Sequence, residues 1–289
     1  MMINGKITVA AALKDAVATL SLNKSITTQR LDAEVLLCHI LNCERIDLII
    51  KKDKLLDEES AYLFFDYIKR RVNNEPVSYI TKTKEFMSLE FDVEEGILIP
   101  RPDTEILVEE IINLYKDKSS KILDLCTGSG AIAVSLAFYL KKSYVTAVDK
   151  YDICLETAKK NAIKHNVDKR VSIIKKDVLK PIDINDDFDC IVSNPPYIKS
   201  DVLTTLPDDV KDYEPIYALD GGDDGIIFYE KITEFAQNKL KSGGILAYEI
   251  GYDQAESVKK IINETNSFNE IKLTKDLSGL DRVIIAKKE

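Results

Sequence analysis

The spacing of hydrophobic residues in the first quarter of the chain is typical of α-helices. Thr8 can cap an apolar stretch that ends near Leu20, and apolar residues then recur at intervals of three and four from residues 27–28 onward. A third helix is expected to begin near Asp57. Five of its side chains are expected to point inward: Ala61, Phe64, Phe65, Ile68 and Val72. The pattern predicts a small helical domain over residues 1–75.

The hydrophobic period changes to two between residues 76 and 98. Here the apolar side chains of Met87, Leu89, Phe91 and Val93 alternate with polar ones, which is the pattern of a half-buried β-strand. A single strand of this kind needs a partner, so we expect a hairpin. Residues 76–98 are therefore predicted to form a β-hairpin linker between the helical domain and the remainder of the chain.

From residue 99 to residue 289 strand-like and helix-like stretches alternate. The strand candidates are 121–126, 144–149, 171–177, 188–193 and 244–250, and the helix candidates are 130–140, 153–165, 226–240 and 254–263. This alternation is typical of an α/β fold with a doubly wound parallel sheet, which binds ligands beyond the carboxyl ends of its strands. Two final strand candidates, 270–274 and 282–287, are joined by too short a segment for a helical crossover, so they should pair antiparallel.

Composition and charge narrow the class of protein. The chain has 289 residues and a net charge of −9, which argues against a stable nucleic-acid partner. Its five cysteines form no C-x-x-C pair and it has only two histidines, so we expect no metal site. No apolar run is long enough to span a membrane and residues 1–6 lack a signal-peptide core, so a cytoplasmic protein without membrane contact is expected.

The first candidate for chemistry is the segment from Asp124 to Gly130, which reads DLCTGSG and lies between a predicted strand and a predicted helix. Its glycines allow a tight turn and a close approach of backbone N–H groups to a ligand. Gly128, Gly130 and Ala133, with Asp149 about 20 residues later, also satisfy a dinucleotide-binding fingerprint. The segment predicts a nucleotide-like ligand and leaves its identity open.

Acidic residues follow the next two predicted strands. Asp149 could accept hydrogen bonds from two ribose hydroxyls; the alternative role, capping the next helix, suits Asp152 better. Asp177 could receive an adenine amino group while Val178 contacts the ring face, although a solvated Asp after a strand is also common. Together the two positions favour a nucleoside site at the edge of the sheet.

The most informative motif is Asn194-Pro195-Pro196-Tyr197, which directly follows the fourth predicted strand. Two consecutive prolines stiffen the turn and remove two N–H donors, so its carbonyl groups can face a ligand. The Asn194 side chain and the Pro195 carbonyl can accept both hydrogens of a planar NH₂ group, with the Tyr197 ring stacked on its plane. At the carboxyl edge of a sheet this turn predicts a site for an amide or an aromatic amine.

An amide nitrogen is a poor nucleophile because its lone pair is delocalised into the carbonyl group. Acceptors that hold both of its hydrogens favour the charge that develops on nitrogen during attack, and a fixed orientation of the reacting atoms lowers the barrier further. Neither a metal ion nor a covalent enzyme intermediate is required. An activated methyl group on a sulfonium fits this chemistry better than a hydride does.

These motifs together resemble the class I S-adenosylmethionine-dependent methyltransferases and, more narrowly, the HemK/PrmC family of release factor glutamine methyltransferases. The narrower resemblance rests on IPRPDTE at 99–105, YEP with ALDGG at 213–222, EIG with Gln254 at 249–254, and Asp276 with Gly279 and Arg282. It implies a seven-stranded sheet whose last strand is antiparallel, preceded by an N-terminal helical domain and a hairpin. Residues 99–289 would then form the methyltransferase domain.

The resemblance also implies roles for single residues. Cys126, Thr127, Gly128, Ser129 and Gly130 would contact the methionine part of S-adenosyl-L-methionine, Asp149 the ribose, and Asp177 with Val178 the adenine. The turn Asn194 to Tyr197 would hold the glutamine of the Gly-Gly-Gln motif of class I peptide chain release factors, with Asn194 also beside the cofactor. The product would be S-adenosyl-L-homocysteine. Cys126 replaces a common glycine and Val178 a common aromatic residue.

Three other functions remain open. Methyltransferases that act on exocyclic amino groups of nucleic-acid bases, such as adenine N6, use a similar turn. However, residues 201–224 contain eight acidic residues and one lysine, which does not favour a nucleic-acid cleft. A nicotinamide-dependent oxidoreductase leaves Asn194 to Tyr197 unexplained, and a non-catalytic adaptor does not need the motif. We expect a monomer whose helical domain docks the release factor.

Overall fold

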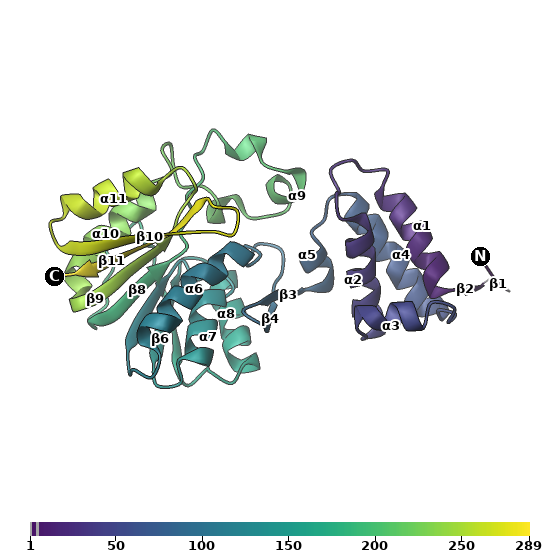
Figure 1. Ribbon diagram of the computed structural model, residues 1–289, viewed down its shortest axis with the longest axis horizontal. Helices are drawn as coiled ribbons and strands as arrows, with labels where there is room; N and C mark the ends of the chain where they lie inside the picture. Colours follow the sequence, from purple (N-terminus) through teal and green to yellow (C-terminus); the bar gives the residue numbers. More distant parts are fainter. Residues whose placement is uncertain (1, 4–5) are drawn as a thin grey trace. The chain divides into compact units, whose positions relative to one another are not determined.

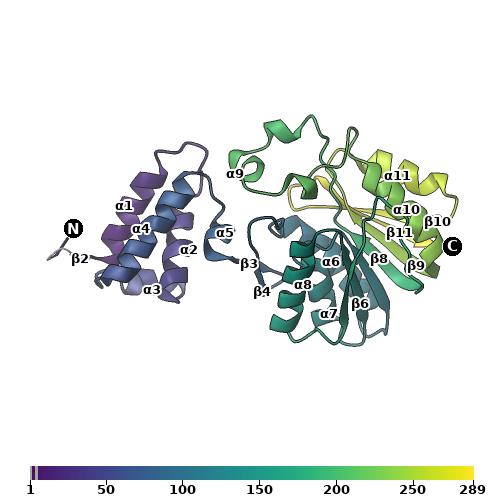
Figure 2. The same ribbon diagram turned by 180° about the vertical axis from the view of Figure 1, so that it is seen from behind.

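A computed structural model describes residues 2–3 and 6–289, so the expectation for residues 1–6 lies partly outside the described residues. The chain divides into two compact units. One contains the chain up to Thr83 together with Leu206–Tyr213, and the other contains Lys84–Thr205 and Glu214–Glu289. Figures 1 and 2 show the chain from two opposite sides. Over the described ranges, no helix is long and apolar enough to cross a membrane.

The N-terminal unit is a helical bundle. Its elements are β1 (Met2–Ile3), β2 (Lys6–Ile7), α1 (Val9–Leu20), α2 (Gln29–Leu41), α3 (Arg45–Ile50), α4 (Glu58–Val72), α5 (Val77–Thr81) and α9 (Asp208–Lys211). The side chains of Thr8 and Asp57 accept hydrogen bonds from the backbone N–H groups of Ala11 and Ser60, as expected of N-caps. The predicted helices from residues 8, 28 and 57 are confirmed.

The inward face of α4 differs from the prediction at one position. Phe64 and Ile68 are buried in the bundle, and Arg71 on the same face forms a buried ion pair with Asp32 at 2.7 Å. Phe65, predicted to point inward, is 36% exposed because it lies about 100° around the helix from Phe64. The prediction for Phe65 was therefore wrong.

The second unit contains a seven-stranded sheet. Its strands are β5 (Lys121–Leu125), β6 (Tyr144–Asp149), β7 (Val171–Lys175), β8 (Phe188–Ser193), β9 (Leu240–Glu249), β10 (Phe268–Lys275) and β11 (Asp281–Lys288). Their order is β10-β11-β9-β8-β5-β6-β7, and β11 is antiparallel to both of its neighbours. The doubly wound sheet with an antiparallel last strand is confirmed. Strand β7 ends two residues before Asp177, earlier than predicted.

Helices cover both faces of this sheet, as Figures 1 and 2 show. The helices α6 (Pro102–Tyr115), α7 (Ala131–Tyr139) and α8 (Asp152–Lys164) cover one face, and α10 (Ile227–Lys239) and α11 (Ala255–Glu264) cover the other. Alternate residues of each strand supply the two cores; for example, Ile122 packs into one and Leu123 into the other. Two short 3₁₀ turns, η1 (Leu203–Thr205) and η2 (Ile216–Ala218), follow β8.

The predicted hairpin is present but short. It consists of β3 (Thr83–Phe86) and β4 (Leu89–Asp92), so Met87 lies in the turn and not in a strand. Met87 and Ser88 both have positive φ, which a two-residue hairpin loop of this kind requires. The Met87 N–H donates to the Glu105 carboxylate at 2.6 Å, and this explains the glutamate of the IPRPDTE segment as a support for the hairpin.

Candidate functional site

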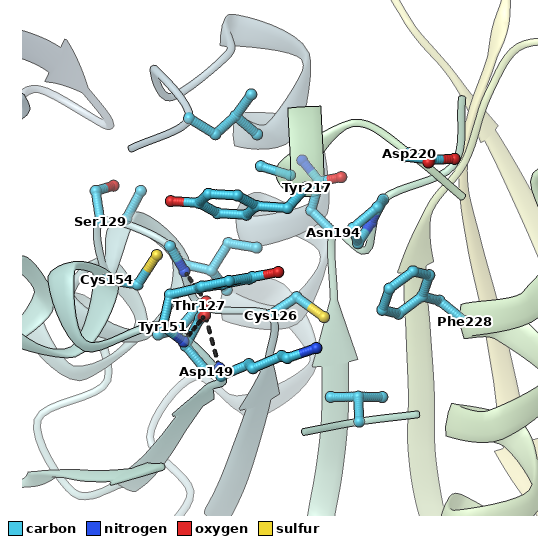
Figure 3. A pocket seen from close by; sticks show the side chains of 18 of the residues that line it. Cys126, Thr127, Ser129, Asp149, Tyr151, Cys154, Asn194, Tyr217, Asp220 and Phe228 are labelled. Atoms are coloured by element: carbon cyan, nitrogen blue, oxygen red, sulfur yellow. Dashed lines mark hydrogen bonds between the residues drawn. The ribbon is translucent and has the colours of Figure 1, made fainter. Parts of the chain in front are cut away.

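A pocket of about 350 Å³ lies beyond the carboxyl ends of β5, β6 and β8, within the usual range for small-molecule sites. Figure 3 shows many of the side chains that line it. Nine of the residues predicted from the sequence line it: Cys126, Thr127, Gly128, Ser129, Asp149, Asp177, Val178, Asn194 and Pro196. Gly130, Pro195 and Tyr197 are not among the lining residues.

Two buried carboxylates hold the glycine-rich loop. Asp124 accepts a hydrogen bond from the Thr127 hydroxyl at 2.5 Å, and Asp149 accepts one from the Gly128 N–H at 2.9 Å. Burial raises the pKa of Asp124 to about 7. Cys126 has a φ of 63°, in the left-handed region where glycine carries no steric cost and other residues lose about 1–2 kcal/mol. The site thus keeps the backbone conformation of a glycine with a thiol in its place.

Asp149 is the strand-end carboxylate expected to bind a ribose. One of its oxygens accepts from the Gly128 N–H, and the other accepts from the N–H groups of Lys150 at 2.7 Å and Tyr151 at 3.1 Å. A carboxylate offers about four lone-pair sites, so acceptor capacity remains for a ligand. Burial raises the pKa of Asp149. Asp152, proposed as the better helix cap, instead forms an ion pair with Lys175 at 2.6 Å.

Gly130 serves the packing of the loop against helix α8. It has a φ of +80°, and a Cβ placed on it would lie 2.9 Å from the Cβ and 3.0 Å from the Cα of Ala158. At Gly128, whose φ is +55°, an added Cβ would meet nothing within 4 Å. The two glycines therefore carry different constraints.

We expect Gly130→Ala to lower the free energy of unfolding by about 2–4 kcal/mol, because overpacking adds to the left-handed strain. Gly128→Ala, with the strain alone, should lose about 1–2 kcal/mol. Urea denaturation of the two variants and the parent measures this difference. Equal losses in both variants would contradict the packing role of Gly130.

The predicted adenine side of the pocket is partly engaged by the protein itself. Asp177 accepts from the Leu179 N–H at 3.1 Å and lies 3.2 Å from the Lys150 ammonium group. Val178 is buried and lines the pocket with an aliphatic surface. Hydrophobic contact is therefore available at this position, although the ring stacking of an aromatic side chain is absent.

Two tyrosines in the pocket were missed by sequence reasoning. The rings of Tyr151 and Tyr217 stack with centroids 3.7 Å apart (Figure 3). The Tyr217 hydroxyl donates to the carbonyl of Gly96, in the segment that follows the hairpin. Tyr151 directly follows the strand-end Asp149, which was a usable signal, whereas Tyr217 lies in a 3₁₀ turn that no periodicity predicts.

The turn Asn194 to Tyr197 follows β8 as predicted, and its polar side chains bind to the protein interior. The Asn194 Nδ2 donates to the Thr104 hydroxyl at 3.1 Å, and the Tyr197 hydroxyl donates to Glu249 at 3.3 Å. The Tyr197 ring packs against the core beneath α10 and α11. Burial, with Glu249 nearby, raises the pKa of Tyr197.

The glycines of the ALDGG segment let the loop that contains them lie close to the Asn-Pro-Pro-Tyr turn. A Cβ on Gly221 would lie 2.8 Å from the Tyr197 Cα and 2.9 Å from the Pro196 carbonyl oxygen. The backbone N–H of Gly221 donates to the Ile198 carbonyl, and that of Ile198 donates to the Leu219 carbonyl. The segment therefore acts as a backbone clamp on the turn.

The arginine of IPRPDTE also has a structural partner. Arg101 forms an ion pair with the buried Glu214 at 2.6 Å, and Glu214 further accepts from the Ile99 N–H at 3.3 Å. The YEP and IPRPDTE segments are thus joined at the pocket rim. Within residues 2–3 and 6–289, no group of three or more His, Cys, Asp or Glu side chains could hold a metal ion.

Comparisons with known proteins agree with this geometry. The PrmC N-terminal domain matches residues 11–81, and the methyltransferase small domain matches residues 102–206. Among solved structures, a methyltransferase from Pyrococcus furiosus superposes with a TM-score of 0.54 at 20% identity, over 77% of this chain and 98% of that one. The fold is that of the class I methyltransferases.

Curated relatives narrow the class. The release factor glutamine methyltransferase of Clostridium acetobutylicum is 46% identical over 257 residues, which cover 88% of this chain and 90% of that protein. The chain belongs to the release factor glutamine methyltransferase family. Relatives of the same name from Clostridium botulinum and Moorella thermoacetica are 45% and 39% identical, over 91% and 96% of this chain and 94% and 98% of theirs.

Proposed function

We propose that the chain methylates the side-chain amide nitrogen of the Gly-Gly-Gln glutamine of class I peptide chain release factors. The observation that carries this proposal is the Asn-Pro-Pro-Tyr turn at the end of β8, of which Asn194 and Pro196 line the pocket. Membership of the release factor glutamine methyltransferase family supports it and does not favour the nucleic-acid alternative.

The pocket fits S-adenosyl-L-methionine as the donor, on the chemistry of its lining. Asp149 keeps acceptor capacity for a ribose hydroxyl, Val178 offers an apolar surface for adenine, and the loop from Cys126 to Ser129 lines the space left for the methionine part. When bound, this cofactor supplies an electrophilic methyl group and leaves as S-adenosyl-L-homocysteine. Asp149 would bind the ribose, the glycine-rich loop would orient the methionine part of the cofactor, and the apolar wall would exclude water.

The turn supplies the second half of the mechanism. The Asn194 Oδ1 and the Pro195 carbonyl would accept the two hydrogens of the substrate amide, which fixes the nitrogen and stabilises the positive charge that develops on it. The two prolines and the Gly221 clamp keep these acceptors in place before the substrate arrives.

The direct test is methyl transfer from labelled S-adenosyl-L-methionine to four acceptors offered separately: a release factor, its Gln-to-Ala variant at the Gly-Gly-Gln motif, DNA and RNA. We expect label on the release factor alone. Label on a nucleic acid, or undiminished label on the Ala variant, would overturn the proposal.

We further propose that residues 1–75 dock the release factor and that residues 99–289 carry the methyltransferase site. Residues 76–98 would link these two parts of the chain. The N-terminal unit has a groove along α4 that combines aromatic with acidic side chains, a suitable surface for a basic protein segment. Its most exposed aromatic residue is Tyr62, which is 78% exposed, and Phe65 lies beside it.

We expect the double variant Tyr62→Ser/Phe65→Ser to raise KM for the release factor about 30-fold, since two aromatic contacts of about 1 kcal/mol each are lost, and to leave kcat unchanged. Steady-state kinetics with varied release factor measures both. Tyr252→Ser, at an exposed tyrosine of the other unit, is the matched control. An unchanged KM in the double variant would contradict docking at this groove.

A further inference from the structure

Beneath the Asn-Pro-Pro-Tyr turn lies a short chain of hydrogen bonds that ends on a buried carboxylate. The Asn194 Nδ2 contacts the Thr104 Oγ1 at 3.1 Å, and the Thr104 Oγ1 contacts the Glu249 Oε2 at 2.5 Å. Thr104 and Glu249 are 4% and 1% exposed, so water does not compete for these bonds. The three residues come from the end of β8, the first turn of α6 and the end of β9.

When Glu249 is ionised, proton counting gives the direction of this chain. An ionised carboxylate can only accept, so the single hydrogen of the Thr104 hydroxyl is donated to Glu249. The hydroxyl oxygen is then left only as an acceptor toward Asn194. Asn194 must therefore present its NH₂ group to Thr104, and its Oδ1 must face away. In the described part of the chain, Asn194 Oδ1 has no hydrogen-bond partner.

We infer that Thr104 and Glu249 are positioning residues that orient the Asn194 amide, so that its oxygen faces the nitrogen to be methylated. This inference rests on the proposed function. A reversed amide would point two N–H donors at the substrate NH₂ group, and it would repel the hydrogens that the site has to accept. The threonine of IPRPDTE and the glutamate of EIG thereby acquire a shared role, at positions 145 residues apart in the sequence.

Several groups surround Glu249 and act on its charge. Arg282 on β11 favours the ionised form of Glu249, and so do the hydroxyls of Thr104 and Tyr197. Asp103, in the first turn of α6, disfavours the ionised form. Arg282 itself lies between Asp276 and Asp103 at 3.1 and 3.4 Å, and the Tyr229 hydroxyl of α10 donates to the Glu249 backbone carbonyl. Burial outweighs the favourable contacts and raises the pKa of Glu249 to about 7.

The test is a double-mutant cycle between Thr104 and Asn194, measured as single-turnover methylation of the release factor. We expect Thr104→Val to lower kcat about 10- to 100-fold, because an Asn194 amide that is no longer held in one orientation accepts the substrate hydrogen only part of the time. KM for the release factor and the Kd of S-adenosyl-L-methionine should stay within about 3-fold of the parent values. Thr104→Ser should restore most of the activity. In the Asn194→Ala background Thr104→Val should have no further effect.

Thr233→Val is the matched control, since Thr233 is also buried and bonds to the Tyr248 hydroxyl away from the pocket. A second arm follows kcat with pH: the parent should gain activity as Glu249 ionises near pH 7, and Glu249→Gln should lose this dependence. Full activity of Thr104→Val, additive losses in the cycle, or an unchanged acid limb in Glu249→Gln would each overturn the inference. Full activity of Asn194→Ala would instead overturn the proposed function.

Discussion

Replacement of Asn194 by alanine is expected to lower kcat for release factor methylation about 10²- to 10³-fold, the usual cost of losing one preorganised hydrogen-bonding group at a reacting centre. The Kd of S-adenosyl-L-methionine should change less than about 10-fold, because most of the cofactor contacts proposed here come from Asp149 and the glycine-rich loop. Single-turnover kinetics and calorimetry measure the two quantities separately.

Asn238→Ala provides the control for this experiment, because Asn238 is exposed on α10 and donates to the Glu234 carbonyl, away from the pocket residues. It should leave both kcat and Kd unchanged. If Asn194→Ala loses cofactor affinity as much as turnover, the side chain serves the cofactor and not the substrate amide.

The second large effect is expected at Asp149. Asp149→Ala should weaken the binding of S-adenosyl-L-methionine about 10- to 100-fold, since the lost hydrogen bond to a charged acceptor contributes about 1.5–3 kcal/mol. The same change also leaves the N–H groups of Gly128, Lys150 and Tyr151 without their acceptor, so it loosens the loop. Titration calorimetry measures the affinity, and thermal unfolding shows whether the fold is kept.

Asp152→Ala is the matched control, three residues away and exposed at the start of α8. It removes only the ion pair with Lys175, so the cofactor affinity should stay the same. A Kd for Asp149→Ala within 3-fold of the parent, in a folded protein, would contradict the ribose-binding role.

The parts of the site that could be predicted are those that follow buried strands. The strands β5, β6 and β8 are short apolar runs, and in a parallel sheet their carboxyl ends meet at one edge. For this reason the glycine-rich loop, Asp149 and Asn194 could be placed together from the sequence, and the structure brings their side chains to one pocket.

Other parts depend on tertiary contacts that leave no periodic signal. Tyr217 lies in a turn, and its place opposite Tyr151 depends on Gly96, which is 121 residues away in the chain. The bond between Thr104 and Glu249 likewise joins a helix start to a strand end. The exposure of Phe65 was misjudged because an apolar residue next to a buried face was assumed to belong to it.

The segment Leu206–Tyr213 has a consequence for how the protein can be divided. It belongs to the N-terminal unit, where the Tyr213 hydroxyl donates to the Asn73 carbonyl at 2.8 Å, although the chain on either side of it belongs to the other unit. The chain therefore passes between the units three times, and no single cut separates them. A fragment that begins after Thr83 would keep Leu206–Tyr213 without the helices that this segment packs with. Removal of both segments of the N-terminal unit, with a short linker from Thr205 to Glu214, would leave the other unit alone.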